Sequence, residues 1–127
     1  MVLGYDTATT VNLSTSVIQP AACQTTSYVA GANEAAVMSM DLTVLSATGT
    51  NLSLMPMFVR DALPSAFAAG SFAIEQLPPS GWTSLHHQAM LALVAGSTYR
   101  FQTGVKTDTT VINPQFTCRG LVMIVKK

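Results

Sequence analysis

The chain has 127 residues, and its composition combines 49% hydrophobic residues with only 9% charged ones. Soluble domains carry roughly 25% charged residues, so the surface of this protein is unusually poor in charge. Six Lys and Arg balance six Asp and Glu, which excludes the basic footprint that nucleic-acid binding needs, and no apolar run approaches the ~20 residues that span a bilayer. We therefore expect one domain with neither a nucleic-acid nor a membrane partner.

Residues 1–20 are expected to form an N-terminal arm and a first strand. Residues 1–10 are polar, show no clear period and contain neither the basic nor the apolar region of a signal peptide. We interpret them as an arm that reaches a neighbouring molecule. The strand is predicted between Thr9 and Ile18 and ends at Pro20. Residues 21–127 are expected to form the compact domain itself.

Residues 36–47 show the clearest strand pattern, because apolar and polar side chains alternate with a period of two. Residues 48–51 are rich in turn formers, and residues 52–60 are predicted to return as the partner strand of a hairpin. Pro56 has no backbone N–H and places this partner at an edge or a bulge. The residues expected on the buried face of the first strand are Met38, Met40, Leu42 and Val44.

The strand pattern is lost between residues 61 and 81, where Pro and Gly are frequent. We expect a long loop there, with a helix candidate over residues 62–69 and a short strand over residues 71–75.

The C-terminal part predicts a second hairpin and a final strand. Residues 82–94 and 98–106 alternate around the turn signal at residues 95–97. Residues 116–126 are apolar on both faces near the end of the strand, which is typical of a central strand or of a subunit contact. About eight short strands with no 3.6-residue period predict an all-β fold, an antiparallel β-sandwich of the jelly-roll type. Few charged residues protect the strand edges, so we expect partner subunits to cover them.

Two cysteines, Cys23 and Cys118, lie near opposite ends of the chain. A disulfide bond between them would close a long loop and stabilise the fold by about 4 kcal/mol in the chain-entropy description. Free cysteines also serve as small buried apolar residues. We expect the second arrangement, with both cysteines reduced.

Neither the histidines nor the carboxylates predict a reaction or a metal site. His86 and His87 are adjacent in a predicted strand and therefore point to opposite faces. The metal-binding cupin jelly rolls, which this chain resembles in length, carry a second histidine where Gln88 stands and a glutamate soon after it, and no glutamate follows here. The acidic residues are isolated beside turn signals, and no nucleophilic Ser or Cys motif is present. We expect no enzyme activity, no catalytic residue, no metal and no cofactor.

Two apolar clusters and one aromatic residue are candidates for contacts with other molecules. Met55, Met57 and Phe58 surround Pro56 and combine flexible thioether side chains with an aromatic one, as adaptable interfaces do. Trp82 follows a Pro- and Gly-rich stretch; we expect it to be a packing anchor, with a platform for stacking a carbohydrate as the alternative. The second cluster lies on one face of the final strand and consists of Leu121, Met123 and Val125.

The charges are unevenly distributed along the chain. Five of the six acidic residues precede His86, and five of the six basic residues follow it. If the fold separates these two halves, one surface is acidic and another basic. Such a separation favours head-to-tail association.

The last third of the chain resembles a known group of proteins. Residues 95–99 (AGSTY) open one strand, and residues 118–125 (CRGLVMIV) form another at the end of the chain. This segment is similar to the last strands of small viral jelly-roll and tumour-necrosis-factor-like domains, in particular those of the decoration, or cement, proteins of tailed bacteriophage capsids. The rest of the chain shares with them its short length and its charge-poor composition, rich in Ser, Thr and Ala.

The resemblance implies a structural viral protein without catalytic residues. Decoration proteins of this kind form homotrimers at three-fold and quasi-three-fold positions of the outer capsid, bind the major capsid protein and stabilise the shell of the virion against internal DNA pressure. The chain would then be made in the host cytoplasm and act on the outer capsid surface. Tyr5 and Asp6 would belong to the arm that contacts the capsid.

Two other functions fit the same fold class. One is a receptor-binding or glycan-binding head domain of a phage tail fibre or spike, in which Trp82 would contact the ligand. The other is a secreted lectin-like module with a bridge between Cys23 and Cys118.

Overall fold

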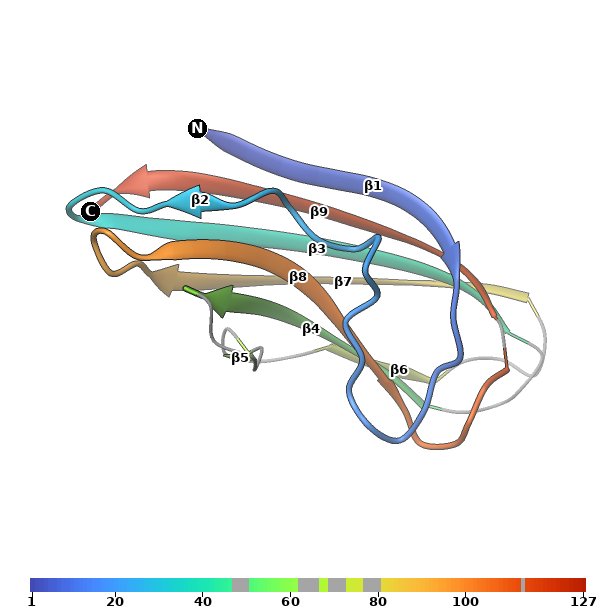
Figure 1. The fold of residues 1–127 in the computed structure, drawn as a ribbon. Helices are drawn as coiled ribbons and strands as arrows, with labels where there is room; N and C mark the ends of the chain where they lie inside the picture. The colour runs from blue at the N-terminus through green and yellow to red at the C-terminus, as the bar shows by residue number, and fades with distance from the viewer. Residues whose placement is uncertain (47–50, 62–66, 69–72, 77–80, 113) are drawn as a thin grey trace.

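The computed structural model describes residues 1–127 except 47–50, 62–66, 69–72, 77–80 and 113. These residues form two antiparallel β-sheets that lie one over the other as a sandwich (Figure 1). Within the described ranges all regular secondary structure is β-strand. The predicted all-β antiparallel sandwich is therefore confirmed.

The chain crosses repeatedly between the two sheets, because β3 and β4, β7 and β8, and β8 and β9 belong to different sheets. The first sheet has the order β1 (Val2–Thr10), β9 (Gln115–Lys126), β3 (Glu34–Ser46) and β7 (Gly81–Ala92). The second sheet has the order β2 (Tyr28–Val29), β8 (Thr98–Thr107), β4 (Asn51–Arg60) and β5 (Phe67–Ala68), with β6 (Ala73–Gln76) also paired to β4.

The hydrophobic core lies between the sheets and includes the face that the alternation in residues 36–47 predicted. Each side chain of that face is 0% exposed, as are Leu54 of β4 and Phe101 of β8 on the facing sheet. Burial of this apolar surface is the main term that holds the sheets together. The confirmed residues of the β3 face are Met38, Met40, Leu42 and Val44.

Both predicted hairpins are wrong, although their strands exist. β3 pairs with β7 and β9, whereas β4 pairs with β8, β5 and β6. The residues 95–97 do form a turn, in which Gly96 has a φ of 84° and the Ser97 N–H donates to the Val94 carbonyl. That turn joins two sheets instead of two neighbouring strands. Of the other predicted turn, residues 48–50 lie outside the described residues.

Pro56 lies in β4, which is an internal strand of the second sheet. β8 pairs with one side of β4 along its length, including Pro56 opposite Thr103. On the other side, the described pairings with β6 stop at Leu54 and those with β5 begin at Met57. β4 therefore lies between β8 on one side and the short strands β5 and β6 on the other, so the prediction that Pro56 places it at a sheet edge is wrong.

The long loop predicted for residues 61–81 contains two short strands. β6 overlaps the predicted strand at residues 71–75, while Phe67 and Ala68, which fall in the helix candidate, belong to β5. The helix prediction is wrong at these two positions. Residues 62–66 and 69 of the candidate lie outside the described residues.

The predicted N-terminal arm is also wrong, because residues 2–10 form β1 and pair with β9 from Val2 opposite Met123 to Thr10 opposite Gln115. Burial alternates regularly along β1. The predicted strand over residues 9–18 is instead a connection with isolated bridges at Leu13 and Ile18. The inward positions of β1 include threonines, so a search for alternating apolar residues does not detect the period of two in this strand.

β9 lies between β1 and β3, as the apolar character of both its faces predicted. Figure 1 shows this strand running alongside β3 and ending beside the C-terminus. Its inward residues are buried, and its outward residues form the middle of the surface described next.

Candidate functional site

The candidate site is the outer face of the first sheet, which is the surface pointing away from the second sheet. Residues directly opposite each other in antiparallel strands share a face, so the registers of the four strands order this surface into rows. The rows that run across β1, β9, β3 and β7 are Val2–Met123–Val37–Met90, Gly4–Leu121–Ser39–Gln88, Asp6–Arg119–Asp41–His86, Ala8–Thr117–Thr43–Ser84 and Thr10–Gln115–Leu45–Trp82.

One end of the outer face carries an apolar band, which consists of Val2, Val37, Met90, Leu121 and Met123. The exposed fraction is 59% for Val2, 69% for Met90 and 46% for both Leu121 and Met123. The band reaches both edge strands of the sheet. Neighbouring exposed apolar side chains of this kind mark a surface that contacts another molecule.

The middle of the outer face carries a charged row, Asp6–Arg119–Asp41–His86. The His86 Nδ1 lies 2.6 Å from the Asp41 Oδ1, and both side chains are about half exposed. Acidic residues from the first part of the chain therefore flank a basic residue from the last part. The hypothesis that the fold separates acids from bases into two surfaces does not hold at this row.

The far end of the outer face is polar around a single indole. The side chain of Trp82 is 57% exposed, so the prediction of a packing anchor is wrong. A depression of about 380 Å³ lies beside it and is lined in part by Thr10, Gln115 and Thr117. The indole and these side chains come from β7, β1 and β9.

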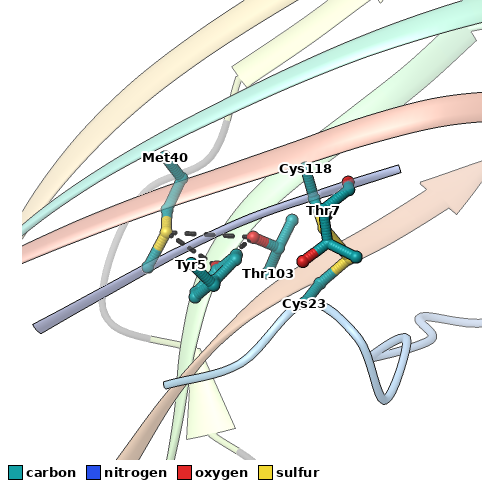
Figure 2. The surroundings of a disulfide bond; sticks show 6 residues. All are labelled: Tyr5, Thr7, Cys23, Met40, Thr103 and Cys118. Atoms are coloured by element: carbon teal, nitrogen blue, oxygen red, sulfur yellow. Dashed lines mark hydrogen bonds between the residues drawn. A yellow bond between two sulfur atoms is a disulfide. The ribbon is translucent and has the colours of Figure 1, made fainter. Parts of the chain in front are cut away.

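The Tyr5 side chain is largely withdrawn from the outside, because it points from β1 into the sandwich and packs against the core. Figure 2 shows it reaching toward Met40 and Thr103. Its hydroxyl donates to the Met40 sulfur at 3.1 Å and shares a hydrogen bond with the Thr103 Oγ1. A Cβ at Gly120 would overlap the Tyr5 ring, so glycine is needed there. The prediction that Tyr5 contacts a capsid is wrong, whereas Asp6 does point outward.

Burial raises the pKa of the Tyr5 hydroxyl far above its usual value, and the hydrogen bond with Thr103 offsets only part of this effect. Tyr5 therefore remains a neutral donor under the outer face. It fixes β1 to both β3 and the opposite sheet.

A disulfide bond joins Cys23 to Cys118, so the prediction of two reduced cysteines is wrong. Cys118 lies on the inner face of β9, opposite Thr7 of β1, and Cys23 lies in the connection between β1 and β2 (Figure 2). The Thr103 N–H of β8 donates to the Cys23 carbonyl at 3.0 Å. The bond therefore ties the connection, and through it the second sheet, to the centre of the first sheet.

Comparison with known proteins identifies the fold. No protein-family model matches the chain, and no curated protein matches it in sequence. A solved structure of the Eiger TNF from S. frugiperda is similar over 100% of this chain and 94% of its own chain, with a TM-score of 0.63 and 10% sequence identity. The chain has a tumour-necrosis-factor-like jelly-roll fold. At this identity the similarity shows the fold alone.

A hydrogen-bonded carboxylate holds the end of the jelly roll beneath the apolar band. Glu34 accepts from the Tyr28 hydroxyl at 2.6 Å and from the Gly31 N–H at 2.8 Å, and Lys126 lies 3.5 Å away. The Tyr28 bond is the main cause of a lowered pKa of Glu34, and it raises the pKa of Tyr28. The start of β3 is thus fixed to the end of β9.

The two predicted apolar clusters do not meet in the jelly roll. Leu121, Met123 and the half-buried Val125 lie on the outer face of the first sheet. Met57 of the second sheet is buried, so the prediction that it belongs to a surface that contacts other molecules is wrong. Met55 and Phe58 are half-buried in the same strand of the second sheet, and the Phe58 ring lies 6.0 Å from that of Tyr99.

The sequence did not single out Val2, Val37 and Met90, although all three belong to the apolar band. Alternation within residues 82–94 places Met90 on the same face as Trp82. The missing information was which strands are neighbours, because only the pairing brings these residues together.

The histidines lie on opposite sides of β7, with His86 opposite Asp41 and His87 opposite Met40. In the part of the chain that the structure describes, no three His, Cys, Asp or Glu side chains are grouped so that they could hold a metal ion. The described residues also contain no helix long and apolar enough to cross a membrane.

Proposed function

We propose that this chain is a structural subunit that assembles with copies of itself into a homotrimer and decorates the outer surface of a bacteriophage capsid. The observation that carries the proposal is the apolar band, which leaves Val2, Met90, Leu121 and Met123 exposed on one face of the chain. Contacts between permanently associated subunits resemble a hydrophobic core cut in half. A second copy would remove these side chains from water.

The position of the band supports a ring of subunits. In a closed ring each subunit contacts two neighbours through two different patches. The band extends from Val2 on the edge strand β1 to Met90 on the edge strand β7, so it offers apolar surface at both sides of the sheet. This arrangement suits the trimer that the resemblance to decoration proteins implies.

The composition supports permanent assembly. Only 9% of the residues are charged, and the cores of protein interfaces are depleted in charge. A subunit whose surfaces are covered by its own copies and by the major capsid protein needs few charges to stay in solution.

The disulfide bond is compatible with a role on the released virion. Disulfide bonds persist in oxidising surroundings and are rare in reducing cytoplasm. If the chain is made in the host cytoplasm, we expect the bond between Cys23 and Cys118 to form after the particle leaves the cell.

The self-association is tested by the mass of the protein in solution, measured by multi-angle light scattering. We expect a trimer for the natural chain and a monomer for the double variant Leu121→Lys and Met123→Lys, which places two charges in the apolar band. The matched control is Val29→Lys, because Val29 is also exposed, at 61%, but lies in the other sheet. A monomeric natural chain, or loss of the trimer in the Val29 variant alone, contradicts the proposal.

The decoration role is tested by cosedimentation with capsid shells assembled from the major capsid protein of the same genome. The trimer is expected to sediment with the shells and to raise their resistance to heat. A stable trimer that stays in the supernatant at saturating concentration overturns the decoration role while leaving self-association standing.

A further inference from the structure

The polar end of the outer face contains an aromatic residue that neither the core nor the apolar band uses. Trp82 is the single tryptophan of the chain, and 57% of its side chain is exposed. Leu45, half-buried, lies between Trp82 and Gln115 in the same cross-strand row. An indole exposed to this extent leaves a large apolar surface in contact with solvent.

The depression beside the indole has the size and chemistry of a small-molecule site. Its volume of about 380 Å³ falls in the range of roughly 300–1,000 Å³ that is common for such sites. Gln115 supplies an amide that both donates and accepts, and Thr10 and Thr117 supply hydroxyl groups. No charged residue is among the described residues that line it.

The nearest charged row on this face runs through Asp6 and Arg119. It lies two residues along β1 and β9 from Ala8 and Thr117, which also line the depression, or about 7 Å at the rise of a strand. The charged row therefore borders the depression, while the described residues that line it offer only neutral hydrogen-bonding groups.

We propose that this depression binds a neutral oligosaccharide. The C–H face of one sugar ring stacks on the indole of Trp82, and the Gln115 amide and the threonine hydroxyls exchange hydrogen bonds with the hydroxyl groups of the sugar. A tryptophan ring has an electron-rich face that attracts such C–H groups. The site would add an adhesive function to the structural role proposed above, and it does not depend on that role.

The position of the depression separates it from the self-association surface. Met90 of the apolar band lies eight residues from Trp82 along β7, or about 26 Å, and Leu121 of the band lies four residues from Thr117 of the depression along β9, or about 13 Å. A copy that covers the apolar band therefore leaves room for a ligand at Trp82.

The single tryptophan makes the test direct, because its fluorescence reports on this site alone. The probes are neutral hexasaccharides of glucose, mannose, galactose and N-acetylglucosamine, titrated into the 127-residue protein. We expect a saturable change in emission with at least one of them. No saturable change with any of the four overturns the proposal, as does an equal change with a heparin hexasaccharide.

Variants separate ligand binding from packing. Gln115→Ala should weaken binding of the active sugar by about threefold to tenfold, the loss of one or two hydrogen bonds. Calorimetry should show no binding by Trp82→Ala and retained, weaker binding by Trp82→Phe, with Val29→Ala unchanged as the control. Light scattering of Trp82→Ala provides the second readout: a loss of the trimer would assign Trp82 to a subunit contact and overturn the site.

Discussion

The two faces of the first sheet use the same four strands for different purposes. On the inner face, Met38, Met40 and Leu42 are 0% exposed and pack against the second sheet. On the outer face, the alternate residues of the same strands form the apolar band, the charged row and the polar end with Trp82. Alternate residues of one strand can thus specify the fold and a binding surface separately.

The largest effect is expected on the inner face, from removal of the disulfide bond. The double variant Cys23→Ala and Cys118→Ala should lower the free energy of unfolding by about 4 kcal/mol, because the bond spans 95 residues and strongly restricts the unfolded chain. Urea unfolding monitored by circular dichroism measures the change. Reductant should lower the stability of the natural chain but not that of the variant; an equal response of both would contradict this explanation.

A matched pair of leucines compares the faces directly. Leu42 on the inner face is fully buried, whereas Leu121 on the outer face is 46% exposed. Leu42→Ala should lower the unfolding free energy of the protomer by about 3 kcal/mol, through lost burial and the cavity left behind. Leu121→Ala should change it by less than about 1 kcal/mol.

The same leucine pair should rank in the opposite order for self-association. Leu121→Ala weakens the trimer, which dilution followed by light scattering detects, and Leu42→Ala leaves the contact surface unchanged. If the two variants lost the same unfolding free energy, Leu121 would have to be buried within the isolated chain. That result would contradict its position on an exposed outer face.

Alternation in the sequence predicted the inner face of β3 because a period of two depends only on neighbouring positions in one strand. The pairing of strands depends on long-range contacts, which is why both hairpins were predicted wrongly. The turn at residues 95–97 has the chemistry of a hairpin turn, yet it leads β8 into the other sheet. Local turn signals specify a change of direction and do not specify the partner strand.

The outer face was predictable only in part, for the same reason. Leu121, Met123 and Val125 were recognised because they alternate in one strand. Val2 and Met90 were not, because only the registers of β1 with β9 and of β3 with β7 bring them into the same row. The disulfide bond was missed because a separation of 95 residues carries no information on proximity.

The last comparison concerns two polar contacts, one on each face, of which the outer one is expected to have the smallest effect. The Tyr5 hydroxyl inside the sandwich bonds to the Met40 sulfur and to Thr103, whose side chain is 0% exposed. Tyr5→Phe should lower the free energy of unfolding by about 1 to 2 kcal/mol, because it leaves the buried Thr103 hydroxyl with a poorer partner.

On the outer face, Asp41→Asn changes the contact with His86. The free energy of unfolding should change by less than about 0.5 kcal/mol, because water already solvates both half-exposed side chains. Urea unfolding of both variants at neutral pH provides the comparison. If Asp41→Asn lowered the free energy of unfolding as much as Tyr5→Phe does, the Asp41–His86 pair would have to be shielded from water. The charged row would then belong to the contact between copies and would not be exposed to solvent.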